Sequence, residues 1–123
     1  MRKLIFIAFM VMSVCGYAQK YEVGTTTAVW KAPAAADFLH AKAIGVKYVE
    51  VAFNQCYRGV PVDEVIPRIK EMKAKIDSAD IEVWSIHLPF SRTLDISVLD
   101  DRLRKENVDF MAEMIELCAM VQP

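Results

Sequence analysis

Ile81-Glu-Val-Trp-Ser-Ile-His-Leu-Pro-Phe90 is a short run of β-branched and aromatic residues, too short for an ordinary helix, and it predicts a buried strand. Pro89 ends this strand because it lacks a backbone N–H. Side chains alternate along a strand, so we expect one face to carry Val83, Ser85 and His87, and the other to carry Glu82, Trp84, Ile86 and Leu88. Trp84 is thereby predicted to pack under a helix. His87 lies at the carboxyl end, where parallel α/β folds place their chemistry.

Two strands and a helix are predicted upstream. Residues 20–27 and 46–53 are rich in Val, Thr and aromatic residues, which favour strands. Within the first strand, Gly24 indicates close approach by another backbone or a ligand. Residues 34–44 are good helix formers, and Gly45 supplies the left-handed residue that ends a helix. The strand at 46–53 predicts one face with Lys47, Val49, Val51 and Phe53, and another with Val46, Tyr48, Glu50 and Ala52.

The remaining segments predict a loop and two helices. Residues 54–61 predict a polar loop, and apolar residues at helical spacing follow from Val62 to Ile76. The regular amphipathic helix is expected to begin only a few residues before Pro67, so that Pro67 falls in its first turn. Ser97 to Asp100 resembles a helix cap. A core-facing helix follows, whose stripe is Leu103, Asn107, Val108, Met111, Met114, Ile115, Cys118 and Val121.

The order strand–helix, repeated three times, predicts an α/β fold with a parallel sheet. A doubly wound nucleotide-binding sheet should carry a glycine-rich turn after its first strand, and three threonines follow Gly24 instead. We therefore expect the first three βα units of a (β/α)₈ TIM barrel. Such a barrel needs roughly 250 residues, so the barrel is incomplete in this chain.

The first residues predict an export signal. Arg2 and Lys3 precede an apolar run from Leu4 to Val14, and Gly16-Tyr-Ala18 fits a peptidase site. We expect a signal peptide over 1–18, a domain over 19–123, a periplasmic or secreted protein, and no stable membrane span after cleavage. Two alternatives stay open, namely an uncleaved anchor and a lipoprotein attached through Cys15.

The charge balance bears on the expected partners, and the positions of the cysteines bear on disulfide formation. The 15 basic residues balance 16 acidic ones and form no basic stripe, so we expect no nucleic-acid partner. Cys56 falls in the predicted loop, and Cys118 falls late in a helix running toward the opposite end. We therefore expect no disulfide between them.

Two segments resemble a known superfamily. Residues 41–51 carry Gly45 and Glu50 in a Gly-aromatic-x-x-Val-Glu-like strand, and residues 84–90 carry His87 and Pro89 in a strand ending in His-x-Pro. This pattern resembles the amino-terminal portion only of the xylose isomerase-like TIM-barrel superfamily. The sugar phosphate isomerase/epimerase branch is the nearest, and zinc-dependent apurinic-site endonucleases form a more distant branch.

The resemblance implies a metal-dependent enzyme that moves a proton next to the carbonyl of a sugar. The implied cofactor is a divalent metal (Mn, Mg, Co or Zn) with ligands mostly beyond residue 123. The carboxylates that transfer the proton also belong to later strands, so no catalytic residue is expected within this chain. The implied partner is a small carbohydrate, and the oligomeric state is left open.

Four residues are candidate substrate contacts: His87, Glu50, Asn54 and Arg58. His87 would be a metal ligand only in an endonuclease-like protein. A core histidine and a structural, ion-paired Glu50 are the alternatives, because a carboxylate within a β-branched run is costly to bury alone. Asn54 and Arg58 could instead belong to a solvated loop. Three functions remain open: part of an exported isomerase or epimerase, a non-catalytic sugar-binding barrel, or an inactive truncated fragment.

Overall fold

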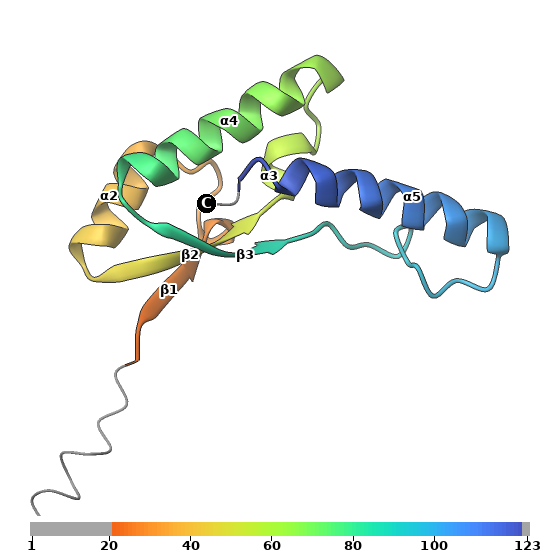
Figure 1. The fold of residues 1–123 in the computed structure, drawn as a ribbon, viewed down its shortest axis with the longest axis horizontal. Coiled ribbons are helices and arrows are strands. Elements are labelled where there is room, and N and C mark those ends of the chain that lie inside the picture. The colour runs from red at the N-terminus through yellow and green to blue at the C-terminus, as the bar shows by residue number, and fades with distance from the viewer. Residues whose placement is uncertain (1–20, 122–123) are drawn as a thin grey trace, which may run out of the picture.

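The computed structural model describes residues 21–121, so the predicted signal peptide lies outside the described residues. These residues form a three-stranded parallel sheet in the order β1-β2-β3 (Figure 1). The strands are β1 (Val23–Thr26), β2 (Val46–Ala52) and β3 (Glu82–His87). The predicted α/β architecture of three βα units is confirmed.

Helices connect the strands and cover one face of the sheet (Figure 1). Their bounds are η1 (Thr27–Val29), α2 (Ala35–Ala43), α3 (Asn54–Tyr57), α4 (Val62–Ser78) and α5 (Asp101–Cys118). The three long helices were predicted. The prediction of a plain loop over 54–61 is wrong, because α3 occupies its first half. Sequence periodicity cannot reveal a helix of one turn.

Turn chemistry explains several boundaries. Gly45 has a φ of 96°, the left-handed conformation expected after α2. Asp100 caps α5, since its side chain accepts a hydrogen bond of 2.8 Å from the Leu103 N–H. A Cβ at Gly24 would lie 3.2 Å from the Tyr48 carbonyl oxygen. The predicted close backbone approach at Gly24 is therefore confirmed.

Pro67 lies further into its helix than predicted. The helix begins at Val62, directly after Pro61, so Pro67 falls in the second turn. There it removes the N–H that would bond to the Asp63 carbonyl. Burial of Ile69 and Ile76 on the same helix offsets this loss, because each fully buried side chain contributes about 1.5–3 kcal/mol.

The core lies between the sheet and its covering helices. At the start of β2 the predicted faces are wrong, because Val46 is buried in the core cluster and Lys47 is exposed. Val49, Val51 and Phe53 of the β2 region are completely buried, which confirms the rest of the predicted core face. They pack in one cluster with Phe38 of α2 and Ile69 of α4. The opposite face of the sheet carries Tyr48 and Glu50 and is open to solvent in the described part of the chain.

A register shift in β3 changes its predicted faces. Val83 pairs with Val49, but the next partner of β2, Glu50, faces Ser85, so Trp84 is an extra residue in a β-bulge. Val83 and Ile86 consequently both pack on the core. The prediction that Val83 shares a face with Ser85 and His87 is wrong. So is the placement of Trp84 under a helix, since Trp84 is 74% exposed.

Only the carboxyl-terminal part of α5 packs on the core. Met114, Cys118 and Val121 are buried, whereas Val108 and Ile115 are exposed, and α5 extends beyond the sheet (Figure 1). The predicted core-facing stripe thus holds for the last turns, whereas Asn107 further forward is buried against the preceding loop, where its side-chain amide donates to the Asp95 carbonyl oxygen at 2.9 Å. Cys56 and Cys118 are free thiols. They belong to the same core cluster, so the premise that they lie at opposite ends is wrong.

Candidate functional site

The candidate site lies at the carboxyl ends of β2 and β3, on the open face of the sheet. The strand register sets Glu50 beside Ser85 and Ala52 beside His87. The Phe53 N–H donates to the His87 carbonyl oxygen at 3.1 Å, which extends the ladder past the last residue of β2. The backbone at His87 is thereby fixed against β2.

Glu50 joins Ser85 and His87 of β3. The Ser85 hydroxyl donates to Glu50 Oε2 at 3.1 Å, and His87 Nδ1 lies 3.8 Å from Glu50 Oε1. The latter distance fits an ion pair when the imidazole is protonated, but it is too long for a hydrogen bond. The side chains of His87 and Glu50 are 49% and 39% exposed. The carboxylate thus has the partners that its position in a β-branched strand requires, and it keeps access to solvent.

Aromatic rings flank this trio of Glu50, Ser85 and His87. The Trp84 and Tyr48 rings meet edge to face with centroids 5.4 Å apart, and the His87 ring lies 5.4 Å from that of Phe90. Trp84 and Tyr48 line an open depression of about 450 Å³ together with Glu50 and Ser85. Sequence reasoning missed this aromatic wall because the bulge that turns Trp84 outward leaves no mark in the residue pattern.

Hydrogen bonds from η1 and α3 hold the neighbouring strand end. Thr27, which is fully buried, accepts a hydrogen bond of 2.8 Å at Oγ1 from the Ala52 N–H. Gln55 Nε2 donates to the carbonyl oxygens of Thr27, at 3.1 Å, and Trp30, at 2.8 Å. These contacts tie the end of β1 to the end of β2. Neither Thr27 nor Gln55 was singled out from the sequence, where Thr27 is one of three consecutive threonines.

Asn54 and Arg58 lie apart from the trio. Both line a groove between α3, α4 and the segment before α2, together with Arg68, Glu71 and Lys75 of α4. The structure therefore brings Glu50 and His87 together and places the other two predicted contacts in a separate depression.

The implied metal can be tested against the donor atoms present. Within residues 21–121, no group of three or more His, Cys, Asp or Glu side chains could hold a metal ion. Glu50 and His87 offer one carboxylate and one imidazole, which is fewer than the ligand sets of metal sites in proteins. The described residues alone do not fit a complete metal site.

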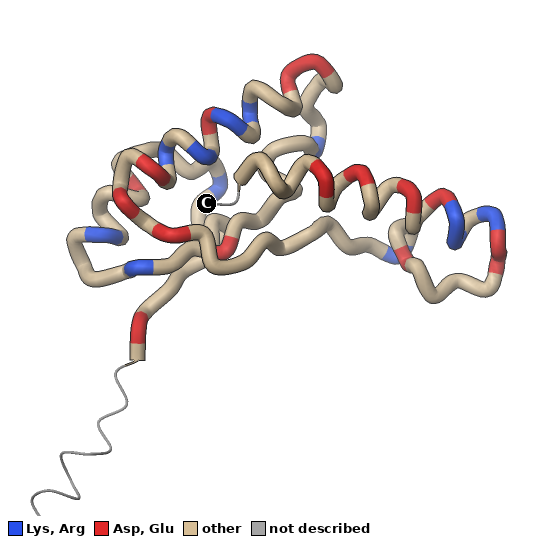
Figure 2. The backbone as a smooth tube through the Cα atoms, viewed as in Figure 1, with Lys and Arg blue, Asp and Glu red and all other residues tan. Residues whose placement is uncertain are grey.

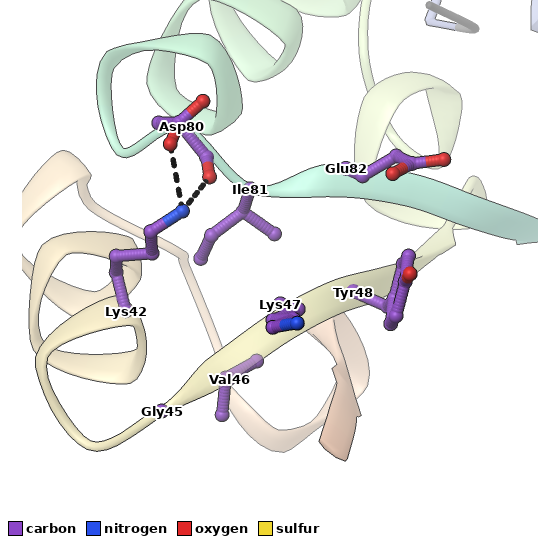
Figure 3. A pocket seen from close by; sticks show the side chains of 8 residues that line it. All are labelled: Lys42, Gly45, Val46, Lys47, Tyr48, Asp80, Ile81 and Glu82. Atoms are coloured by element: carbon purple, nitrogen blue, oxygen red, sulfur yellow. Dashed lines mark hydrogen bonds and ion pairs between the residues drawn. The ribbon is translucent and has the colours of Figure 1, made fainter. Parts of the chain in front are cut away.

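A third depression lies at the opposite, amino ends of β2 and β3. Lys42 Nζ donates to Asp80 Oδ2 at 2.8 Å across this depression, and Val46 and Ile81 lie beneath it (Figure 3). Lys42 lowers the pKa of the Asp80 carboxyl through this hydrogen bond and its charge. Glu22 pairs with Lys47 and accepts a hydrogen bond of 2.5 Å from the Tyr48 hydroxyl. In parallel βα barrels this end serves stability.

Parallel βα units with polar side chains at the carboxyl ends of the strands are the building units of βα barrels. A family model described as xylose isomerase-like TIM barrel matches residues 38–122, and the chain belongs to that family. The family predicted from Glu50 and His87 is thereby confirmed. No curated protein matches the chain. No helix within residues 21–121 is long and apolar enough to cross a membrane.

Proposed function

We propose that the chain supplies the amino-terminal part of the carbohydrate site of a metal-dependent sugar isomerase or epimerase. The observation that carries this proposal is the convergence of Glu50, Ser85 and His87 on one open face, at the strand ends. A carboxylate accepts hydrogen bonds from two adjacent sugar hydroxyls, and an imidazole can accept or donate one. The nearby Trp84 and Tyr48 rings would cover an apolar face of the sugar.

In this proposal the trio binds and orients the substrate. Ser85 holds one carboxylate oxygen of Glu50, which leaves the lone pairs of Oε1 directed toward His87 and the open face. Family membership supports the reaction class, in which a proton moves next to a carbonyl. The acid and base groups and most metal ligands would come from strands beyond residue 123, as the resemblance implies.

Titration of aldoses and ketoses into the whole protein, followed by calorimetry, tests the binding role. Glu50→Gln should weaken sugar binding by about 10-fold, because a charge-assisted hydrogen bond contributes about 1.5–3 kcal/mol. His87→Asn should weaken it as well. Glu82→Gln is the matched control, since Glu82 lines the depression at the amino ends of the strands. Equal affinity in Glu50→Gln, Glu82→Gln and the parent protein would refute the proposal.

Export is a separate part of the proposal, supported by the pattern of the first residues. We propose cleavage after Ala18, so that the exported protein begins at Gln19. Amino-terminal sequencing of the protein recovered from outside the cytoplasm tests this. Recovery with residues 1–18 attached would favour an uncleaved anchor, and a lipid on Cys15 would favour a lipoprotein.

A further inference from the structure

The groove lined by Asn54 and Arg58 lies away from the open face and is strongly cationic. It has a volume of about 320 Å³ and is formed by α3, α4 and the segment before α2. Figure 2 shows Lys and Arg positions along α4 and in the neighbouring connecting segments. The charged and amide residues that line this cationic groove are Lys31, Asn54, Gln55, Arg58, Arg68, Glu71 and Lys75.

The positive charges of the groove exceed the negative ones. Glu71 is the one carboxylate in its lining, and it pairs with Lys75 at 2.7 Å. Arg68 has a long contact of 3.8 Å with Glu64, outside the groove. Lys31 and Arg58 have no ion-pair partner within residues 21–121, so their charges are uncompensated there.

Charged residues of α4 lie close enough to α3 to act on the pKa of Cys56. Burial raises the pKa of the Cys56 thiol, while the positive charges of Arg68 and Lys75 oppose that rise. Lys75 Nζ also donates to the Pro33 carbonyl oxygen at 3.0 Å, which holds it against the segment before α2. This contact keeps the Lys75 ammonium group near the groove.

A buried acceptor in the same lining also lacks a partner. Gln55 uses its Nε2 for two backbone carbonyls, and its Oε1 is buried without a hydrogen-bond partner in the described part of the chain. A buried unpaired acceptor costs about 1–3 kcal/mol. Because Gln55 lines the groove, a ligand hydroxyl that displaces its neighbours and reaches Oε1 would satisfy this acceptor, which favours a ligand that carries both an anion and a hydroxyl.

We propose that the cationic groove is a second binding site, distinct from the Glu50–Ser85–His87 trio, that holds the phosphate group of a small molecule. Arg58 and Arg68 present planar guanidinium groups that bind phosphate oxygens in pairs, and Lys31 adds a point charge. The groove lies on the helix side of the sheet, whereas the trio lies on the open face. The proposal therefore does not depend on the proposed sugar site.

Calorimetric titration of the whole protein with inorganic phosphate and with glycerol phosphate tests this proposal. We expect saturable binding of both, and tighter binding of glycerol phosphate because its hydroxyls can reach Gln55. Arg58→Gln and Arg68→Gln should each weaken binding by about 10-fold, the loss of one charge-assisted pair. Lys73→Gln is the matched control, since Lys73 is on α4 but pairs with Asp77 outside the groove.

The variants must first show the thermal unfolding of the parent protein, so that lost binding is not lost folding. Inorganic phosphate binding as tightly as the ester would identify free phosphate as the ligand and still support the site. Absence of saturable binding by the parent protein would overturn the proposal. So would equal weakening by Lys73→Gln, because that result indicates general charge attraction.

Discussion

Thr27 illustrates how a single hydroxyl fixes one strand end to another. Its side chain is fully buried, and its Oγ1 accepts the Ala52 N–H at 2.8 Å. Valine has nearly the same shape but no acceptor. Thr27→Val should therefore lower the free energy of unfolding by about 1–3 kcal/mol, the cost of a buried unpaired N–H. Urea denaturation measures this change.

Thr27→Ser is the control for this prediction, because serine keeps the hydroxyl and loses a methyl group. It should cost about 1 kcal/mol for the missing methyl. If Thr27→Val proves as stable as the parent protein, the Ala52 N–H has another partner and the hydroxyl does not fix the strand ends.

Cys56 gives the stability of the fold a pH dependence. Burial raises the pKa of its thiol from 9.0 to about 11 in the folded protein. Between these values the unfolded state loses its proton first, so stability falls as pH rises from about 9 to about 11. The loss reaches about 2–3 kcal/mol, at roughly 1.4 kcal/mol per pKa unit.

Comparison of the parent protein with Cys56→Ala isolates this effect, since Tyr and Lys residues titrate in the same range in both proteins. Urea denaturation at several pH values should show a steeper decline in the parent protein. Parallel declines would mean that the thiol ionises equally easily in both states.

The trio shows what can be predicted at the scale of residues. The need of Glu50 for a partner could be predicted from its β-branched neighbours. His87 could be predicted as a site residue from its place at a strand end before Pro89. The identity of the partner could not be predicted, because Ser85 meets Glu50 only through the register of two strands that are distant in sequence. The groove around Arg58 depends in the same way on residues of α4.

At the scale of elements, α5 has few packing contacts at its start and depends on its cap. Its first turns lie beyond the sheet, and Asp100 accepts the Leu103 N–H there. Asp100→Ala should destabilise these turns by about 1 kcal/mol, whereas Asp100→Ser retains a capping oxygen and should cost little. Faster hydrogen exchange confined to the first turns of α5 in the alanine variant would confirm this, and unchanged exchange would contradict it.

Long elements with a clear period were predictable, and short or irregular ones were not. The stripe of α4 and the alternation of β2 from Val49 onward follow from apolar spacing, because burial acts on every repeat of a long element. The single turn of α3 has too few residues to show a period. The length of α4 ahead of Pro67 was underestimated because core burial further along that helix outweighs one missing hydrogen bond.

At the scale of the whole molecule, the two tryptophans report on the two faces of the sheet. Trp30 packs on the core, whereas Trp84 is 74% exposed on the open face. Acrylamide should therefore quench Trp84 far more than Trp30. Trp84→Phe should remove most of the quenchable fluorescence, and Trp30→Phe should leave it in place. A shielded Trp84 in the whole protein would show that further structure covers the open face in solution.

The bulge in β3 also bears on how the sequence tolerates a change of length. Trp84 is one residue more than the ladder with β2 requires. If it were removed, Val83, Ser85, Ile86 and His87 would alternate regularly, with their present faces kept. Deletions in buried strands ordinarily turn every later side chain to the wrong face. At Trp84 a deletion would instead straighten the strand. A related sequence with one residue fewer at this position would therefore keep the same core.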